Sequence, residues 1–341
     1  MTWQFNLINE LALKYEAIEN GLSNVPVEVS SNAKKQHLNF TLKKFYLPTI
    51  DNISDVSNQL LWLADPSMFN DPHDCELGID ENFKIYVLEQ MARDTKLFTS
   101  QDRLNIYSAR RRNQDIYSPK VYSILASNGR MQLLDDKYSA LEINIDKYLS
   151  SLKSSRYRVA CFVQDFGDKY ECNDLMWAHY AQSHKGFCVE YEIENIFDST
   201  KFRNYSVFYK DYLNKIYCGS LSAKQQKRIL INGLFPVVYS SKRQTITLGN
   251  AYRIGMGNET SKIQKEVEIK FLRSLITKDL IWKYEREWRL IVCDELVKNL
   301  NYKIPFPFAK TIIPGHSASR ELKLLLKEIA DKLKIKYCGT I

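Results

Sequence analysis

The sequence predicts an α+β fold in which helices pack on a single mixed β-sheet. Three observations favour this fold class: short β-rich segments recur along the chain, a charged and mostly helical stretch spans residues 82–154, and the chain ends in a strand, a helix and a strand. The length of 341 residues is enough for one large domain. We expect residues 1–36 to form an accessory helix and linker, and residues 37–341 to form a single domain.

The composition is that of an ordinary globular protein, with 45% hydrophobic and 26% charged residues. The net charge of +8 is mild for this length, and it fits a polyanionic partner or an anionic substrate without requiring one. Seven cysteines without a CxxC pair argue against a disulfide framework and a zinc ribbon. The first residues lack the features of a signal peptide, and no apolar run approaches the roughly 20 residues that cross a bilayer. We therefore expect a cytoplasmic protein without a membrane partner.

The first half of the chain begins with an amphipathic helix, expected from Phe5 to Asn20. Residues 22–36 show no clear period and are expected to be a linker. The alternation of Leu38–Leu42 predicts a half-buried strand, and the apolar Leu60–Ala64 predicts a buried one. The stretch at 82–154 that follows should be largely helical.

The second half alternates between strands and helices. Strands are expected at residues 157–163, 187–191, 235–239 and 288–293, and helices at 175–181 and 263–277. The polar, Gly-containing residues 247–262 are expected to form a mobile loop. Finally, a strand at 310–315, a helix capped by Ser317 that runs to Lys334, and a strand at 335–338 should close the domain.

The first motif that can carry chemistry is a strand-end turn, Phe69-Asn70-Asp71-Pro72-His73-Asp74. Asn and Asp before Pro form rigid turns because their side chains bond local backbone amides, and this structural role alone explains the residues. A rigid turn after a buried strand also presents Asn70, Asp71 or Asp74 to a ligand. Both interpretations remain open.

The second motif is Leu175-Met176-Trp177-Ala178-His179-Tyr180-Ala181, followed by His184-Lys185-Gly186. A neutral histidine can act as an acid, a base or a metal ligand near pH 7. His179 and His184 are five residues apart, whereas zinc on one helix face prefers a spacing of four. We expect no metal site here. A core histidine bonded to a backbone carbonyl is the alternative for His179.

The third motif is Trp282-Lys283-Tyr284-Glu285-Arg286-Glu287-Trp288-Arg289, which leads into an apolar strand. In an extended chain, Glu285, Glu287 and Arg289 share one face. A carboxylate pair beside an arginine keeps its charge, and it can hold ribose hydroxyls or stabilise a developing cation. A surface ladder of ion pairs is the structural alternative.

In these motifs the sequence resembles the bacterial family called domain of unknown function 2971. The resemblance rests on the Phe69–Pro72 turn, the Cys161-Phe162 pair, the His179 and His184 segments, and Trp282–Arg289. Lys43-Lys44-Phe45 departs from the Tyr-Lys-Tyr that the family pattern has at its first strand. The resemblance implies a bacterial protein with a place in phage defence or stress response, and it implies no established reaction.

Glu285-Arg286-Glu287 is also similar to the Glu-x-Glu motif of ADP-ribosyltransferases. That resemblance implies an ADP-ribosyltransferase-like fold and NAD as cofactor, with Glu287 stabilising the positive charge that develops on the ribose as nicotinamide leaves. Glu285 and Arg289 would orient Glu287 or position the acceptor, and His179 would complete the catalytic group. The NAD or acceptor pocket would be lined by Asn70, Asp71, Tyr180, His184, Tyr239 and Lys44.

The leading hypothesis is therefore a defence or toxin-type effector that uses NAD to modify a nucleic acid or a protein. The first alternative is a metal-dependent nuclease, in which Asp71, Asp74, Glu190 and Glu192 hold Mg²⁺ while Lys185 or Lys242 contacts phosphate. The second alternative is a non-catalytic sensor of a nucleotide or a phage component. The chain contains no Walker A loop, no GxGxxG and no GxSxG motif.

Overall fold

The structure, a computed structural model, describes residues 2–14, 30–31, 34, 41–112, 114, 116–165, 171–192, 196, 199–210 and 216–340. These residues divide into two compact units. The first comprises residues 1–75, 154–242 and 275–341, and the second comprises 76–153 and 243–274. The sequence predicted one domain after residue 36 without this internal division. Two compact units can belong to one folding domain, so the prediction of one domain after residue 36 stays a prediction.

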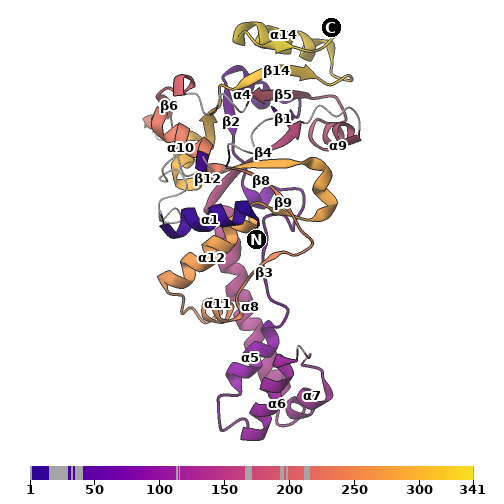
Figure 1. Cartoon of the computed structure of the whole chain (residues 1–341), viewed down its shortest axis with the longest axis vertical. Helices are drawn as coiled ribbons and strands as arrows, with labels where there is room; N and C mark the ends of the chain where they lie inside the picture. Colours follow the sequence, from indigo (N-terminus) through magenta and orange to yellow (C-terminus); the bar gives the residue numbers. More distant parts are fainter. Residues whose placement is uncertain are drawn as a thin grey trace. The chain divides into compact units, whose positions relative to one another are not determined.

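The first unit is built on a seven-stranded mixed sheet, which confirms the predicted α+β class (Figure 1). The strand order is β15-β14-β5-β1-β4-β12-β8. All neighbours in the sheet are antiparallel except β14 and β15, which are parallel. The strands are β1 (Thr41–Tyr46), β4 (Tyr157–Asp165), β5 (Phe187–Glu192), β8 (Leu234–Pro236), β12 (Glu287–Cys293), β14 (Ala309–Pro314) and β15 (Lys336–Tyr337).

The remaining elements of this unit connect and cover the sheet. The helices are α1 (Trp3–Lys14), α4 (Ile50–Ser57), α9 (Glu171–Tyr180), α10 (Ala223–Gly233), α13 (Asp294–Val297) and α14 (Arg320–Leu333). The 3-10 helices are η3 (Pro66–Met68), η5 (Ser199–Lys201), η6 (Leu280–Glu285) and η7 (Lys298–Leu300). Short strand pairs are formed by β2 (Leu60–Trp62) with β13 (Lys303–Pro305), β6 (Tyr205–Lys210) with β7 (Ile216–Leu221), and β9 (Val238–Tyr239) with β11 (Thr277–Lys278).

The two faces of the sheet differ in what covers them. One face forms the main core, in which Leu42, Phe162 and Leu290 pack with apolar residues of α4, α10 and α14. On the opposite face, Met176 of α9 and Ala181, which follows the helix, pack against Phe45, Val163 and Cys188. The alternation of side chains along each strand separates the two sets. The charged residues of β12, Glu287 and Arg289, lie on the α9 side of the sheet because they are cross-strand partners of Val163 and Cys161.

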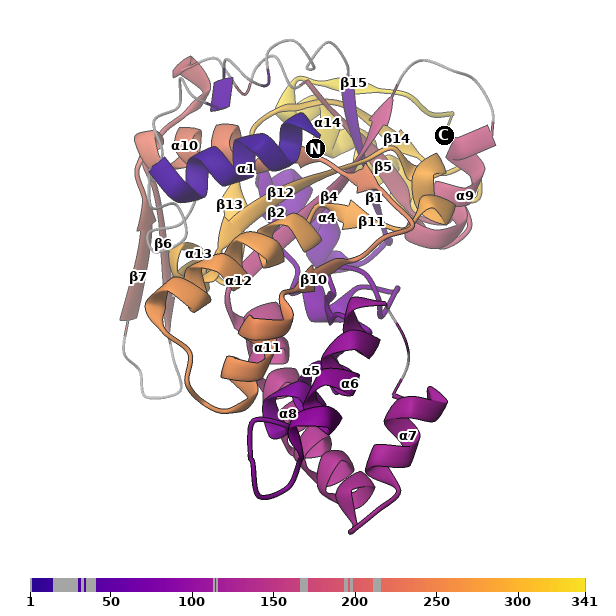
Figure 2. The same ribbon diagram turned by 60° about the horizontal axis from the view of Figure 1, so that its bottom comes forward.

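The second unit is mainly helical, as the sequence predicted for residues 82–154 (Figure 2). It contains most of the 26-residue helix α8 (Arg130–Ser155). Its other helices are α5 (Phe83–Met91), α6 (Ser100–Arg111), α7 (Pro119–Leu125), α11 (Leu248–Gly255) and α12 (Ser261–Ser274), and its strand pair is β3 (Leu77–Ile79) with β10 (Gln244–Ile246). None of the helices in the described residues combines the length and apolarity that a bilayer crossing requires.

Several sequence predictions are confirmed and two are wrong. The terminal strand–helix–strand unit is confirmed, but Ser319 rather than Ser317 caps α14, because the Ser319 side chain accepts the Leu322 N–H. The mobile loop at 247–262 is wrong: Thr247 caps α11, whose Ala251 and Ile254 are buried. The helix predicted at 5–20 is α1, and its predicted end and most of the 22–36 linker lie outside the described residues.

Gly186 provides a test of the junction between α9 and β5. A Cβ atom at this position would lie 2.1 Å from the Tyr46 carbonyl oxygen, an atom of the sheet backbone that cannot give way. We expect Gly186→Ala to lower the free energy of unfolding by about 3 kcal/mol and the melting temperature by on the order of 10 °C. Thermal and denaturant unfolding measure both quantities.

Gly249→Ala is the matched control. Its Cβ would meet only the Tyr86 hydroxyl, at 3.7 Å, inside helix α11. This variant should be unchanged or up to about 1 kcal/mol more stable. An equal loss in the two variants would contradict the tight approach at Gly186.

Candidate functional site

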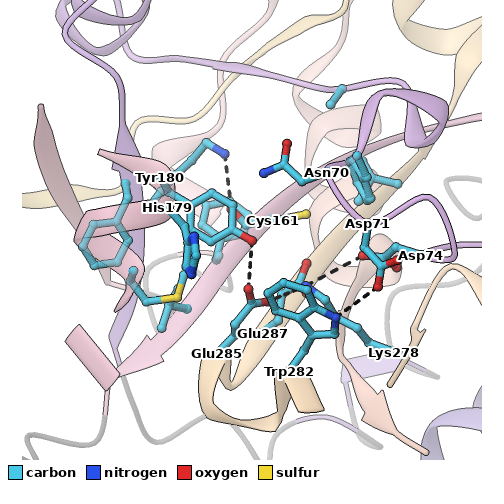
Figure 3. Close-up of a pocket in the computed structure, with 18 of the residues that line it drawn as sticks. Asn70, Asp71, Asp74, Cys161, His179, Tyr180, Lys278, Trp282, Glu285 and Glu287 are labelled. Carbon is cyan, nitrogen blue, oxygen red and sulfur yellow. Dashed lines mark hydrogen bonds and ion pairs between the residues drawn. The ribbon is translucent and has the colours of Figure 1, made fainter. Parts of the chain in front are cut away.

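Three of the predicted motifs meet in one cavity of the first unit, with a volume of about 540 Å³. The strand-end turn contributes Asn70 and Asp71, and helix α9 contributes His179 and Tyr180 (Figure 3). Glu285 and Glu287 line the same cavity from the segment that enters β12. Segments more than 100 residues apart, joined by the Tyr180–Glu285 and Trp282–Asp71 hydrogen bonds, thus share one site.

The cavity lies where two neighbouring strands of the sheet separate. Strand β1 pairs with β5 along all six of its residues, but with β4 only through Thr41, Leu42 and Lys43. Further along β4, Val159 pairs instead with Ala64, through backbone hydrogen bonds of 2.8 and 2.9 Å. The segment of β4 between these two ladders is left open to the cavity, and Val159, Cys161 and Val163 line it.

Lys44 occupies this gap in the ladder. Its Nζ donates a hydrogen bond of 3.2 Å to the Cys161 carbonyl oxygen. Because a buried carbonyl needs a donor, the amine replaces the strand hydrogen bond that β1 no longer supplies. Burial lowers the pKa of Lys44, and this effect outweighs the opposite effect of the negative charge of Glu287. Lys44 was predicted to bind a ligand, and the structure places it in the cavity wall.

Beneath the cavity lies a buried set of charges that we call the ion cluster: Asp74, Lys278, Glu285, Glu287 and Arg289. Arg289 has no exposed side-chain surface. Its Nε and one terminal nitrogen donate to the two Glu287 carboxylate oxygens, at 2.7 and 3.0 Å. Its terminal nitrogens also donate to both Asp74 oxygens, at 2.8 and 2.6 Å, and to the Leu275 carbonyl at 2.9 Å. Arg289 therefore positions Glu287 and does not line the cavity.

Lys278 joins the two glutamates. Its Nζ donates to Glu287 Oε2 at 3.0 Å, is in contact with Glu285 Oε2, and lies 5.0 Å from the centre of the Trp282 ring. The amine also lies 3.8 Å from Asp74 Oδ2. The charge of Glu287 and its neighbours outweighs the burial of Lys278, so its pKa is raised and the amine stays protonated.

The ion cluster holds three carboxylates and two cations, so it carries one excess negative charge when all five groups are ionised. The two glutamates share this excess unequally. Burial favours the neutral form of Glu287, but the charges of Arg289 and Lys278 outweigh it and lower its pKa to about 2. Burial and then the charge of Glu287 raise the pKa of Glu285 above its ordinary value. Glu287 is thus fixed as an anion and Glu285 is the stronger base.

Two tyrosines contact the glutamates from different sides. The Tyr180 hydroxyl donates to Glu285 Oε1 at 2.8 Å, and burial followed by the Glu285 charge raises the Tyr180 pKa, so the phenol keeps its proton. The Tyr239 hydroxyl accepts a 2.7 Å hydrogen bond from the Glu287 backbone N–H. Tyr239 lines a second, shallower hollow with Glu287 and not the main cavity. Tyr239 therefore stabilises the first residue of strand β12.

The strand-end turn is tied to the glutamate segment by Asp71. Its Oδ2 accepts a 3.0 Å hydrogen bond from the Trp282 indole, and its Oδ1 accepts the His73 N–H at 2.9 Å. Asp71 closes the turn, and Asn70 lines the cavity beside it (Figure 3). The ligand-presenting role of the turn stays a prediction.

The two predicted histidines lie in different places. His179 is exposed at the cavity, with its ring centre 6.2 Å from Tyr180 and 6.5 Å from Trp282. His184 does not line the cavity, because it stacks between Trp177 and His316 at ring distances of 5.0 and 4.0 Å. Of the residues predicted to line the pocket, His184 and Tyr239 are therefore outside the main cavity.

Glu285, Glu287 and Arg289 were predicted to share one face of an extended strand, but the backbone conformation between the two glutamates is not extended. Glu285 ends η6, Arg286 has a left-handed φ of 46°, and the strand begins only at Glu287. The turn at Arg286 replaces the extended chain that the alternation argument assumed. All three side chains still meet, through Lys278 and the Glu287–Arg289 pair.

The carboxylates of the nuclease alternative are held in separate interactions. Asp74 pairs with Arg289, Glu190 lies 3.5 Å from Lys43, and Glu192 pairs with Lys310 at 2.8 Å. Across the part of the chain that the structure describes, no group of three or more His, Cys, Asp or Glu side chains is arranged to hold a metal ion. The geometry gives the nuclease alternative no support, and it stays a prediction.

Sequence reasoning missed Lys278, the residue that joins both glutamates. Lys278 ends the two-residue strand β11, which is too short to leave a sequence pattern, so nothing local distinguishes it from a surface lysine. Asp74 was noticed as a turn residue facing a ligand and as a metal ligand, but not as the partner of Arg289, which is 215 positions away. The cavity also contains the free Cys161, which was noted as part of an apolar strand and of the family resemblance but not as a residue of the site.

Comparison with known proteins gives one match. A family model described as "Protein of unknown function (DUF2971)" matches residues 176–290, from the middle of α9 to the middle of β12. This confirms the resemblance to that family over the segment that holds His179, Tyr180 and the two glutamates. No curated protein and no solved structure matches the chain. The similarity to ADP-ribosyltransferases stays a prediction.

The unequal pKa values of the glutamates predict that neutralising each one changes the stability by a different amount at pH 7, with opposite trends as the pH falls. A group whose pKa is lowered on folding stabilises the protein above its unfolded pKa, and this contribution is lost as the pH falls through the folded value. The lowering of the Glu287 pKa from 4.5 to about 2 corresponds to about 3 kcal/mol. We expect Glu287→Gln to lower the free energy of unfolding by this amount at pH 7. The difference from wild type should shrink as the pH falls from about 5 towards 2.

Glu285→Gln is the internal comparison. Because the pKa of Glu285 is raised, its ionised form is disfavoured in the folded protein, and its neutralisation removes the excess charge. This variant should lose less stability than Glu287→Gln at pH 7, and its difference from wild type should move in the destabilising direction as the pH falls. Denaturant unfolding between pH 7 and 3 measures both, and an equal loss at pH 7 would refute the assignment.

Proposed function

We propose that this chain, which resembles the DUF2971 family over residues 176–290, is an enzyme that acts on the glycosidic bond of a nucleotide. ADP-ribosyl transfer from NAD to a nucleic acid or a protein is the leading form of this proposal. The observation that carries it is the pair Glu285 and Glu287, two carboxylates with opposed pKa shifts that share one lysine in the wall of one cavity.

The carboxylate pair supplies the two functions that glycosidic chemistry needs. A fixed negative charge at Glu287 stabilises the positive charge that develops on the ribose in the transition state. Glu285, whose pKa is raised, is the group suited to take a proton from the incoming acceptor. Two neighbouring acids with different protonation behaviour are a recurrent basis for this division of roles.

NAD would supply the ribosyl group, whose C1′–nitrogen bond breaks with its electron pair leaving on nicotinamide. Glu287 would face C1′ as that bond breaks, while an oxygen or nitrogen of the acceptor bonds to C1′. Glu285 would receive the proton that the acceptor loses. Tyr180 and Lys278 would hold Glu285 in position, through the hydrogen bonds that they already donate to it.

The cavity walls suit a ligand with a flat ring and an anionic part. Phe69, Tyr180 and Trp282 line the cavity and can contact an aromatic base or nicotinamide. Lys44 lies in the same cavity, and its single hydrogen bond to a carbonyl leaves donors for a phosphate oxygen. The volume of about 540 Å³ lies within the usual range for small-molecule sites.

A phage-defence or toxin-type effector is the biological setting we propose for this activity. An effector acts by changing the state of a whole cell. An enzyme that modifies a nucleic acid or a protein, or that depletes NAD, does this with one active site. The setting rests on the proposed chemistry and on the family resemblance.

A non-catalytic nucleotide sensor is the second candidate, and one observation favours it. Both oxygens of Glu287 are already engaged by Arg289, and Oε2 is engaged by Lys278 as well. Such complete pairing stabilises a rigid binding site and lowers the charge that a reacting ribose would meet. A sensor predicts ligand-induced thermal stabilisation without turnover.

The proposal is tested by incubating the purified chain with labelled NAD, with and without cell lysate. We expect NAD consumption and transfer of label to a macromolecule. Glu287→Gln should reduce both by at least about a hundredfold, which is the usual effect of removing one stabilising charge from a transition state. Mass spectrometry of released nicotinamide and gel autoradiography measure the two outcomes.

Glu192→Gln is the matched control, since Glu192 lies on β5 of the same sheet and pairs with the surface residue Lys310. Its activity should equal that of the wild type. Absence of NAD consumption and label transfer in the wild type, or activity that survives Glu287→Gln, would refute the enzyme proposal. Thermal stabilisation by NAD without consumption would instead support the sensor.

A further inference from the structure

The second unit carries a hollow of about 420 Å³ along α6, which no motif of the catalytic proposal uses. We call it the arginine hollow and define it by its lining: Arg93, Ser100, Arg103, Leu104 and Tyr107. Arg93 comes from the segment after α5, and the other four residues come from α6 (Figure 2). The family match at residues 176–290 does not include it.

The arginines of the hollow keep their positive charge available. Within the described residues, Arg93 and Arg103 form no ion pair, and Arg103 donates a 3.0 Å hydrogen bond to the Ser100 hydroxyl. The nearby carboxylates are engaged elsewhere. Glu89 pairs with Arg110 at 2.5 Å, and Asp102 accepts the Thr99 N–H in a capping box. The hollow therefore presents two guanidinium groups and a hydroxyl to solvent.

The face of α6 extends this chemistry along the helix. Arg103, Tyr107 and Arg111 follow one another at intervals of four residues, so they lie on the same face. Leu104 is 63% exposed and Tyr107 is 37% exposed. An exposed leucine and tyrosine between arginines leave apolar surface in contact with water, which a partner with flat apolar groups would cover.

We propose that the arginine hollow binds single-stranded nucleic acid. Guanidinium forks and a serine hydroxyl match phosphate oxygens, and they hold successive phosphates without reading the sequence. Tyr107 provides the ring on which an unpaired base stacks. A duplex hides its base faces, so it would leave the Tyr107 and Leu104 surface uncovered. This proposal does not depend on the chemistry of the cavity in the first unit.

The test is binding of the full chain to fluorescent single-stranded RNA and DNA of about 20 nucleotides, followed by polarisation across a range of salt concentrations. The affinity should fall as the salt concentration rises. A plot of the logarithm of the association constant against the logarithm of the salt concentration should have a slope of about −0.7 for each phosphate contact. Arg93→Glu with Arg103→Glu should weaken binding at least tenfold and lower the slope. Tyr107→Ala should weaken binding of oligonucleotides but not of inorganic polyphosphate, since only the former has bases to stack.

Lys147→Glu with Lys262→Glu is the matched control. Both lysines are exposed in the same unit, on α8 and α12, and the net charge changes by the same amount. This variant should bind within about twofold of the wild type if the hollow is the site. Equal losses in the two double variants, or wild-type binding that Arg93→Glu with Arg103→Glu does not change, would overturn the proposal. Stronger binding to duplex than to single strands, or to an acidic peptide than to either, would overturn it as well.

Discussion

The site depends on one buried guanidinium. Arg289 has no exposed surface. It donates four hydrogen bonds to the carboxylate oxygens of Asp74 and Glu287, and a fifth to the Leu275 carbonyl oxygen. A planar fork can hold two carboxylates at once, which a lysine amine cannot do with the same geometry. Removing it would leave two buried carboxylates without their partner, a loss of about 3–5 kcal/mol in comparable sites. The arginine thus fixes where the glutamates stand before any ligand arrives.

The charge imbalance of the ion cluster is a consequence of this arrangement. Two cations cannot fully neutralise three buried carboxylates, so the carboxylate that makes no hydrogen bond with Arg289 receives the least stabilisation. Glu285 is that carboxylate, and it contacts Lys278 and Tyr180. The difference between two chemically identical side chains arises from one interaction that only one of them makes. This asymmetry is what makes the pair suited to divided roles.

Much of the fold follows from local patterns in the sequence, whereas the ion cluster does not. The apolar runs of β4 and β12 and the periodicity of α14 are local features of the sequence, and these elements were predicted within a few residues. Helix α11 was missed because its glycines suggested a loop, although Thr247 caps it and its apolar face is buried. The turn at Arg286 was missed because a left-handed arginine has no sequence pattern.

The candidate site was predicted only in part, because local patterns mark some of its residues and contacts between distant segments leave no such pattern. Turn chemistry marked Asn70 and Asp71, and the unusual density of charged and aromatic residues marked Glu285 and Glu287. His184 was grouped with them because it is close to His179 in sequence, yet a tight left-handed turn at Gln182–His184 directs it to His316. Lys278 and the Asp74–Arg289 pair depend on contacts between distant segments, which composition and spacing do not reveal.

The separation of β1 from β4 has a mechanical consequence. Only three residue pairs join the two strands, so the seven-stranded sheet consists of two halves that share a short seam. Bending of the sheet is easiest along such a seam, because few ladder bonds resist it. A molecule lodged in the gap would touch both halves, and its residence there would stiffen the hinge between them.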